Sequence, residues 1–292
     1  MDCDNPSFIT GKGFVRCNRC HSCKVNKKKE WADRLFVESR YWSNSYFISL
    51  TYDPEHIPKD LSLSKKDIFD WKKRLGYYFG KVPQLYYCGE YGSIGDLPHY
   101  HAIIFTNEDH WDDIMNSWSF GNVDIKHLTR GRCNYIAGYV VKKLDKQART
   151  DGRTPEFYGA SRRPPLGYQL LYDLLERIAT DDKFRERVMR SPYPPYSIKI
   201  GGDFVRLPPY IRNKLSPIWK LYNEEIQEQF KAQKVQESIA ILKAIKKNLQ
   251  DLHRVDESDR LDWKWLRMSM MDIIEERARN KCRAYDIRNR RL

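Results

Sequence analysis

The sequence lacks any long apolar run. No stretch of about 18 consecutive apolar residues occurs in the 292-residue chain, and no charged segment followed by an apolar one opens it. We therefore expect neither a membrane span nor a secretory signal, and no membrane partner. The missing leader, together with an odd number of cysteines, seven, predicts a reducing compartment in which thiols stay free.

Acidic residues are too few to balance the basic ones. Lys and Arg number 52 against 39 Asp and Glu, which gives a formal charge of +13, and 13% of the residues are aromatic. A basic chain rich in Tyr and Trp suits a polyanion whose bases stack on aromatic rings. Composition therefore favours single-stranded nucleic acid over a small acidic metabolite, although a basic protein without such a partner has the same composition.

Four of the seven cysteines lie near the start of the chain. Cys17, Cys20 and Cys23 form a CxxCxxC pattern, and Cys3 precedes them. Spacers of two residues let neighbouring thiolates converge on one ion, and Cys3 would complete a tetrahedral set, so we predict a structural zinc site. Unliganded thiols, His21 as a substitute ligand and an iron–sulfur cluster remain alternatives on spacing alone.

The richest chemical pattern lies in residues 85–105. His99 and His101 are separated by one residue, and alternate residues of a strand share a face, so both imidazoles should project to one side. Residues 85–91 predict a partner strand, and a hairpin between the two strands would bring Glu90 beside the histidines. Two imidazoles and one carboxylate leave open positions on a divalent ion, which is typical of a catalytic site. Histidines that only satisfy hydrogen bonds are the alternative.

A second chemical pattern lies in residues 134–146, for which we predict a helix. Tyr135 and Tyr139 are four residues apart, so both phenols occupy one helix face, and Lys142 lies three residues further on. A tyrosine oxygen can act as a nucleophile when a metal polarises the electrophile and a cation such as Lys142 lowers the proton affinity of the phenol. The same spacing also packs a helix against a sheet, so core packing is the alternative.

Basic residues gather beside both patterns and after them. They predict contacts with the phosphate groups of a nucleic acid, although a solvated surface shows the same charge pattern. The predicted DNA-contacting residues are Lys27, Lys28, Arg130, Arg132, Lys143, Arg162 and Arg163.

Several segments, in this order along the chain, resemble the HUH-superfamily rolling-circle replication initiators. They are FISLTY at 47–52, PHYH at 98–101 and YIAGYVVKK at 135–143. The cysteine pattern and two further segments are similar to the initiators of small single-stranded-DNA phages, the Microviridae of gokushovirus type. These segments are GEYG at 89–92 and ASRRP at 160–164, and the resemblance covers residues 1–170.

The resemblance implies a site-specific single-strand endonuclease and strand transferase. Such an enzyme would start rolling-circle replication at a single-stranded DNA origin in the cytoplasm of a bacterial host, with host replication proteins as further partners. The resemblance also implies that Glu90, His99 and His101 hold Mn²⁺ or Mg²⁺ against the scissile phosphate.

The resemblance implies a role for each tyrosine. Tyr139 forms the YxxK pattern of the family with Lys142 and would attack the phosphorus first. The enzyme would then be linked to the 5′ phosphate and would release a free 3′ hydroxyl, and Tyr135 would attack in a later step. Gly138 stands where the family pattern predicts a lysine, which leaves open which lysine assists which tyrosine.

We predict an α+β fold, with a central antiparallel sheet flanked by helices as in HUH endonucleases. An N-terminal cysteine knuckle should lie within residues 1–30 of an endonuclease domain over 1–170, followed by a mainly helical region over 171–292. Strands are expected at 46–52, 85–91, 99–105 and 122–126, and helices at 24–41, 64–79 with Ser64 as N-cap, 111–118, 168–189 and 217–253.

Two other functions remain open at this stage. A zinc-dependent hydrolase would use the histidine pair with a metal-bound water, would be indifferent to Tyr139→Phe and would leave no covalent adduct. A non-catalytic zinc protein that binds single-stranded nucleic acid would keep its binding when His99 and His101 are replaced by alanine, and would never cleave the strand.

Overall fold

The protein was analysed as a computed structural model in which the chain forms two compact units. One unit comprises residues 27–217, and the other comprises Met1–Asn26 with Ile218–Leu292. The domain boundary expected at residue 170 stays a prediction. Most of the helix expected over 217–253 lies outside the described residues, which are 3–9, 13–92, 95–142, 151–200, 202–221, 232, 236, 239 and 240.

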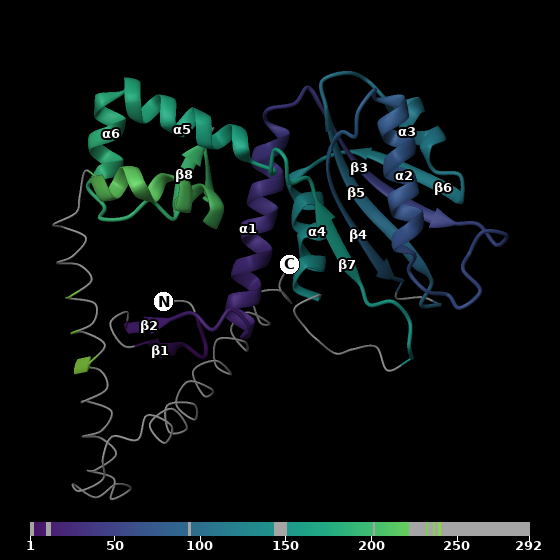
Figure 1. Cartoon of the computed structure of the whole chain (residues 1–292), viewed down its shortest axis with the longest axis horizontal. Helices are drawn as coiled ribbons and strands as arrows, with labels where there is room; N and C mark the ends of the chain where they lie inside the picture. Colours follow the sequence, from purple (N-terminus) through teal and green to yellow (C-terminus); the bar gives the residue numbers. More distant parts are fainter. Residues whose placement is uncertain are drawn as a thin grey trace, which may run out of the picture. The chain divides into compact units, whose positions relative to one another are not determined.

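A five-stranded antiparallel sheet forms the centre of the larger unit (Figure 1). Its spatial order is β6-β3-β5-β4-β7, so β5 lies in the middle with a partner on each side. Aromatic and β-branched residues fill the central strands, as a pleated and buried surface requires. The α+β prediction with a central antiparallel sheet is confirmed, while the likeness to the HUH fold stays a prediction. The strands are β3 (Asn44–Tyr52), β4 (Gln84–Tyr91), β5 (Pro98–Thr106), β6 (Gly121–His127) and β7 (Phe157–Ala160).

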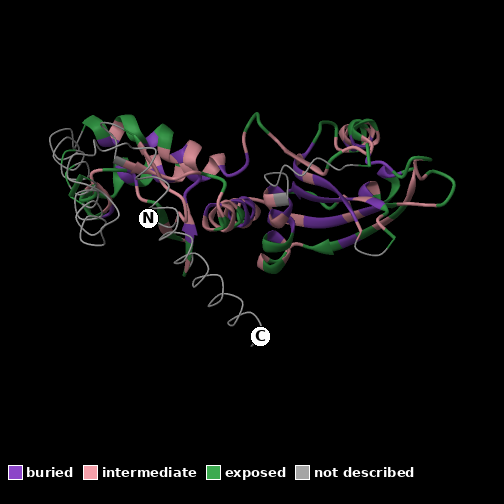
Figure 2. Ribbon diagram, turned by 90° about the horizontal axis from the view of Figure 1, so that it is seen from below, coloured by how far each residue is buried: buried purple, intermediate pink, exposed green. Residues whose placement is uncertain are grey.

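Helices cover both faces of this sheet. One face carries α2 and α3, and the other carries α4 and the part of α1 that lies in the larger unit. Buried residues therefore follow the strands on both sides, as Figure 2 shows. The helices are α1 (His21–Ser39), α2 (Lys65–Tyr78), α3 (Trp111–Ser117) and α4 (Arg130–Lys142). Within the described part of the chain, no helix is both long enough and apolar enough to cross a bilayer.

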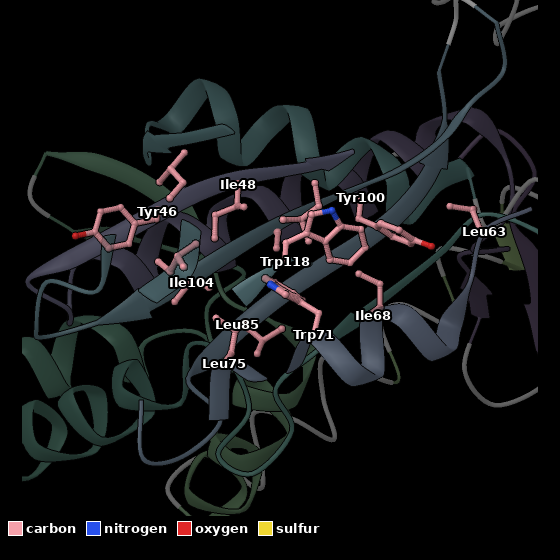
Figure 3. Close-up of a cluster of buried hydrophobic side chains, with 14 of the residues drawn as sticks. Tyr46, Ile48, Leu63, Ile68, Trp71, Leu75, Leu85, Tyr100, Ile104 and Trp118 are labelled. Atoms are coloured by element: carbon pink, nitrogen blue, oxygen red, sulfur yellow. The ribbon is translucent and has the colours of Figure 1, made fainter. Parts of the chain in front are cut away.

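On the first face, α2 and α3 pack over β3, β4 and β5 (Figure 3). Trp71 and Leu75 of α2 are fully buried in this cluster. The indole Nε1 of Trp71 donates a hydrogen bond of 2.9 Å to Oγ of Ser117, which joins α2 to α3. Ser64 caps α2 as predicted, because its Oγ accepts a hydrogen bond of 3.1 Å from the backbone N–H of Asp67.

The second face packs α1 and α4 on alternate residues of the same strands. Phe47 of β3, Tyr86 of β4 and Ile103 of β5 form a buried cluster with Trp31 of α1 and Ile136 of α4. Successive residues of a strand point to opposite faces, so the residues two and four positions before Ile103 share this face. The face that carries the apolar core under α4 therefore also carries both histidines.

A smaller set of elements follows β7. We predicted one helix over 168–189, and this prediction is wrong because the chain breaks at Asp181, which is extended at φ −111° and ψ 97°. The Asp181 carboxylate accepts a hydrogen bond of 2.9 Å from the N–H of Phe184 and so caps a second helix. The helices are α5 (Tyr168–Thr180) and α6 (Asp182–Met189), and β8 (Ser197–Ile200) pairs with β9 (Asp203–Arg206). In the smaller unit, β1 (Ser7–Ile9) pairs with β2 (Gly13–Val15).

Candidate functional site

The β4–β5 hairpin brings a carboxylate to the two histidines. Its register pairs Glu90 with His99 and Cys88 with His101. Residues opposite each other in antiparallel strands point to the same face, so Glu90 projects toward α4 with both imidazoles. One carboxylate oxygen, Oε1, lies 2.9 Å from Nε2 of His99 and 3.1 Å from Nε2 of His101. The group is shielded from solvent, because Glu90 is 5% exposed and His101 is 7% exposed.

The second nitrogen of each imidazole is held by another group. Nδ1 of His99 lies 3.2 Å from the carbonyl oxygen of Leu97, and Nδ1 of His101 lies 3.0 Å from Oγ of Ser49. A carbonyl oxygen only accepts, so Nδ1 of His99 carries the proton, and Nε2 of the neutral ring turns a lone pair toward Glu90. That contact is favourable only when a proton or a cation lies between the two atoms. Metal-binding histidines are commonly held in this way through the outer nitrogen.

The three residues could therefore hold a divalent cation. Nε2 of His99, Nε2 of His101 and a carboxylate oxygen of Glu90 all lie within 4.8 Å of one another. A mixed set of nitrogen and oxygen ligands suits Mn²⁺ at least as well as Mg²⁺. The predicted choice between these two ions stays a prediction.

Helix α4 adds two phenols to the same carboxylate oxygen. The hydroxyl of Tyr139 donates a hydrogen bond of 2.5 Å to Oε1 of Glu90, and the hydroxyl of Tyr135 lies 3.4 Å from that oxygen and 3.4 Å from Nε2 of His101. The imidazole of His101 is stacked between the ring of Tyr139 and the ring of Phe47. The two phenols differ in access, because Tyr139 is 7% exposed and Tyr135 is 51% exposed.

The surroundings keep both phenols protonated. Burial raises the pKa of Tyr139, and its hydrogen bond to the Glu90 carboxylate raises that pKa further. Burial also raises the pKa of Tyr135, where the hydrogen bond from Tyr139 offsets part of the shift and the charge of Glu90 adds to it. Either hydroxyl therefore needs a compensating positive charge before it can act as a phenolate.

The position of α4 follows from its apolar residues and its N-terminal cap. Ile136 and Val140 are buried against the sheet, so the helix turns the residues before and after them toward the end of the β4–β5 hairpin. The helix begins four residues earlier than we predicted. The reason is Thr129, whose Oγ1 accepts a hydrogen bond of 3.2 Å from the backbone N–H of Arg132 and so caps the helix.

Two of the predicted DNA-contacting residues are engaged by the protein itself. Arg130 forms an ion pair of 2.9 Å with Asp33 of α1. Arg132 donates a hydrogen bond of 2.8 Å to the carbonyl oxygen of His127. Both contacts tie the start of α4 to its neighbours, so a structural role is sufficient to explain these two arginines, and their contact with DNA stays a prediction.

The remaining predicted DNA-contacting residues lie apart from that pair. Lys27 lies 3.5 Å from a carboxylate oxygen of Glu30, and its neighbour Lys28 is exposed. Arg162 and Arg163 are exposed in the turn after β7. Their role in DNA binding is untested by the structure. The side chain of Lys142 and the whole of Lys143 lie outside the described residues.

A second candidate metal site lies in the smaller unit. Sγ of Cys3 lies 3.6 Å from Sγ of Cys17 and 3.8 Å from Sγ of Cys20, and Sγ of Cys17 lies 4.0 Å from Sγ of Cys23. A tetrahedral zinc ion with Zn–S bonds of about 2.3 Å separates its sulfur ligands by about 3.8 Å. The four sulfurs, which all lie within 4.8 Å of one another, therefore fit such an ion, and the set is complete without His21.

Backbone amides point at these sulfurs. The N–H of Cys17 donates to Sγ of Cys3 at 3.3 Å, the N–H of Cys20 donates to Sγ of Cys17 at 3.3 Å, and the N–H of Asp4 donates to Sγ of Cys20 at 3.2 Å. Burial alone would raise the pKa of Cys17, but amide donors, led by that of Arg19, outweigh it and lower the pKa to about 7. The fold thus favours the thiolate form that a metal ion requires.

Sequence reasoning did not assign a role to Phe47, Ser49 or the carbonyl of Leu97. Phe47 and Ser49 alternate on β3, and this alternation was visible in the sequence. Their place beside His101 depends on the pairing of Ser49 with His101 across β3 and β5. That register joins strands far apart in the chain, and no short-range pattern specifies it.

The fold and the site together define a class. It is an α+β protein in which a group of two histidines and one carboxylate on an antiparallel sheet faces two tyrosines of one helix. Residues 45–145, which include β3, the β4–β5 hairpin and α4, match the family model of the "Replication-associated protein ORF2" type.

Two curated phage proteins are similar to this chain. The "Replication-associated protein VP4" of Bdellovibrio phage phiMH2K is 28% identical over 177 residues, covering 52% of this chain and 55% of that protein. The "Replication-associated protein ORF4" of Chlamydia phage 1 is 28% identical over 152 residues, covering 44% of this chain and 38% of that protein. The matches thus span about half of the first relative and less of the second. They confirm the predicted resemblance to phage replication initiators.

One solved structure also matches. It is the "hypothetical protein ORF119 from Sulfolobus islandicus rod-shaped virus 1", with 14% sequence identity and a TM-score of 0.27, and the match covers 40% of this chain and 95% of that chain. A TM-score this low does not establish a common fold.

The Glu90→Gln substitution is expected to weaken binding of Mn²⁺ by about a hundredfold. The amide keeps the shape of the side chain, but it removes the negative charge that both histidines and Tyr139 contact. Isothermal titration with Mn²⁺ of metal-stripped protein checks this. Glu108→Gln, a change of equal charge at a side chain that is 84% exposed, is the matched control and should leave the Mn²⁺ affinity unchanged. Equal affinity of the Glu90→Gln and wild-type proteins would remove Glu90 from the metal site.

Proposed function

We propose that this chain is a site-specific single-stranded DNA endonuclease and strand transferase that initiates rolling-circle replication of a phage genome. The observation that carries the proposal is one carboxylate oxygen, Oε1 of Glu90, within 3.4 Å of two tyrosine hydroxyls and of the Nε2 atoms of both histidines. The printed names of the phage relatives support replication as the process. The formal charge of +13 supports a polyanionic substrate.

The proposed setting follows from the same relatives. Because they come from phages, the place of action would be the cytoplasm of a bacterial host. The partners would be a single-stranded DNA origin and host replication proteins. Glu90, His99 and His101 would hold the divalent cation, Mn²⁺ or Mg²⁺, which when bound supplies Lewis-acid polarisation of the scissile phosphodiester. The thiolates of the cysteine cluster would hold Zn²⁺ as a structural ion.

The first chemical step would belong to Tyr139. Its oxygen forms a bond with phosphorus while the bond from phosphorus to the 3′ oxygen breaks; the phenol proton is lost, and the leaving oxygen takes up a proton to become a 3′ hydroxyl. The protein is then joined to the 5′ phosphate of the downstream strand. The stacking of Tyr139 on His101 holds the phenol in place, and its low exposure keeps water from competing with it.

Tyr135 would carry the return step. Its hydroxyl lies 3.4 Å from the carboxylate oxygen that accepts the hydrogen bond of Tyr139, so either phenol can reach one phosphate position. Attack of a second phenol, or of a 3′ hydroxyl, on the phosphotyrosine exchanges one phosphodiester for another without external energy. The strand could therefore be closed into a circle. Lys142, the predicted partner of Tyr139, would favour the phenolate by its positive charge.

Incubation of the wild-type protein with single-stranded oligonucleotides that tile the genome encoding it tests the proposal. With Mn²⁺ present, we expect a protein–DNA species that survives a denaturing gel and retains a label placed at the 3′ end of the oligonucleotide. The 5′-labelled fragment should be released with a 3′ hydroxyl that a polymerase can extend. Cleavage without an adduct would instead indicate a metal-dependent hydrolase, and binding without cleavage would indicate a non-catalytic single-strand binder.

A further inference from the structure

Gly138 of α4 leaves a gap that a lysine of another helix occupies. An ideal Cβ atom at position 138 would lie 3.8 Å from Cε and 3.9 Å from Nζ of Lys28, which belongs to α1. The ammonium group of Lys28 thus lies against the backbone of α4. Glycine lowers the stability of a helix interior relative to alanine, so its presence here calls for a local reason. Room for the Lys28 side chain is such a reason.

The packing of α1 explains why Lys28 reaches α4. Lys28 precedes Ala32 by four residues and Leu35 by seven, so the three residues share one helix face. Ala32 and Leu35 are buried in the same cluster as Ile136 and Ala137 of α4. Lys28 continues this face one turn past the edge of the core. Its aliphatic part can therefore cross α4 while its charge stays in water.

The place where Lys28 crosses α4 adjoins the candidate site. Gly138 follows Tyr135 by three residues, so the two are neighbours on the helix surface. Tyr135 is the more exposed of the two phenols, at 51% against 7% for Tyr139, so the site opens to solvent on the side of Tyr135. Lys28 is itself exposed, and among the described residues it forms no ion pair. Its charge is therefore available to a ligand.

We propose that Lys28 binds a phosphate group of the DNA strand beside Tyr135, through the space that Gly138 leaves open. The proposal rests on the proposed function, because it takes the ligand to be a phosphodiester chain. A phosphate that enters this site approaches the negative charge of Glu90. A cation at the entrance compensates for that repulsion, and a charge-assisted contact adds to it. Lys28 is thus a positioning residue for the strand, and Gly138 is small because Lys28 passes over it.

A binding measurement separates this role from catalysis. Affinity for oligothymidylate, measured by fluorescence anisotropy in EDTA so that no cleavage occurs, is expected to fall about tenfold in Lys28→Ala. The slope of log affinity against log salt should fall by about 0.7, the value for one phosphate contact on a single strand. Lys29→Ala removes the same charge from the next residue of α1, which is also exposed, and should change the affinity less than about threefold.

Gly138 provides the sharper test. Gly138→Ala should bind like wild type, because a Cβ at 3.8 Å from Lys28 makes only an ordinary contact. Gly138→Leu should lose affinity like Lys28→Ala, because it displaces the ammonium group. The double variant Lys28→Ala/Gly138→Lys should regain most of the affinity, since the charge returns to the same place from α4. Thermal unfolding of each variant identifies any that fails to fold.

The outcomes distinguish this proposal from the function beneath it. Equal losses for Lys28→Ala and Lys29→Ala, or no recovery in the folded double variant, would overturn the role of Lys28 even if the wild-type protein forms its adduct. Absence of any adduct from the wild-type protein would instead overturn the proposed nuclease, whatever the Lys28 variants bind.

Discussion

The Tyr139→Phe variant is expected to lose formation of the first covalent protein–DNA species by at least about ten-thousandfold, because it removes the nucleophile. The ring would remain, so its stacking on His101 and the packing of α4 should be preserved. The rate is measured in a single-turnover reaction with excess protein, labelled single-stranded DNA and Mn²⁺, followed on a denaturing gel. Thermal unfolding should give a midpoint close to that of the wild type.

Tyr135→Phe is expected to behave differently. Because Tyr139 is the predicted first nucleophile, this variant should still form the adduct, but it should fail to transfer the bound strand and release a closed circle. Tyr172→Phe, on α5 and 58% exposed, removes a hydroxyl outside the site and should change neither step. An adduct formed at the wild-type rate by Tyr139→Phe and lost in Tyr135→Phe would reverse the order that we assign to the two phenols.

The Cys20→Ser variant is expected to lose the structural metal and the folding of the smaller unit. Wild-type protein should contain one zinc per chain in the smaller unit, and removal of one of four thiolates should reduce that content to nearly zero. Zinc sites of this kind contribute about 10 kcal/mol or more of binding free energy, which is folding free energy when the site does not exist in the unfolded chain. A domain fragment this short has little other core to hold it.

Metal analysis by mass spectrometry and thermal unfolding with and without EDTA measure this effect. Cys133→Ser, at a buried thiol under α4 in the larger unit, is the control and should keep its zinc. Wild-type protein purified with iron and the visible absorbance of a cluster would establish the iron–sulfur alternative. Wild-type protein without any metal, and indifferent to EDTA, would show that the four cysteines are free thiols.

Short-range patterns in the sequence predicted the parts of the site that lie close together in the chain. The alternation of His99 and His101 placed both imidazoles on one face, and the short connection to β4 brought Glu90 opposite His99. The spacing of Cys17, Cys20 and Cys23 likewise predicted the gathering of sulfurs that the structure has. In each case a turn or a two-residue spacer leaves the chain few ways to arrange these atoms.

Other features depend on contacts between distant segments. The bond of Ser49 to His101 requires the register of β3 against β5, and the different exposure of Tyr135 and Tyr139 depends on how α4 packs. The contact of Lys28 with Gly138 joins two helices whose distance no spacing reveals. These contacts are decided by tertiary packing, which local patterns do not encode.

The identity of the residue that carries the DNA tests the central claim most directly. Trypsin should release residues 133–142 as one peptide, CNYIAGYVVK, which contains both tyrosines. Mass spectrometry of the nuclease-trimmed adduct is expected to find a nucleotide on this peptide, attached through phosphate to Tyr139. A nucleotide on any residue other than Tyr139 or Tyr135, or cleaved DNA with this peptide unmodified throughout the reaction, would contradict the account.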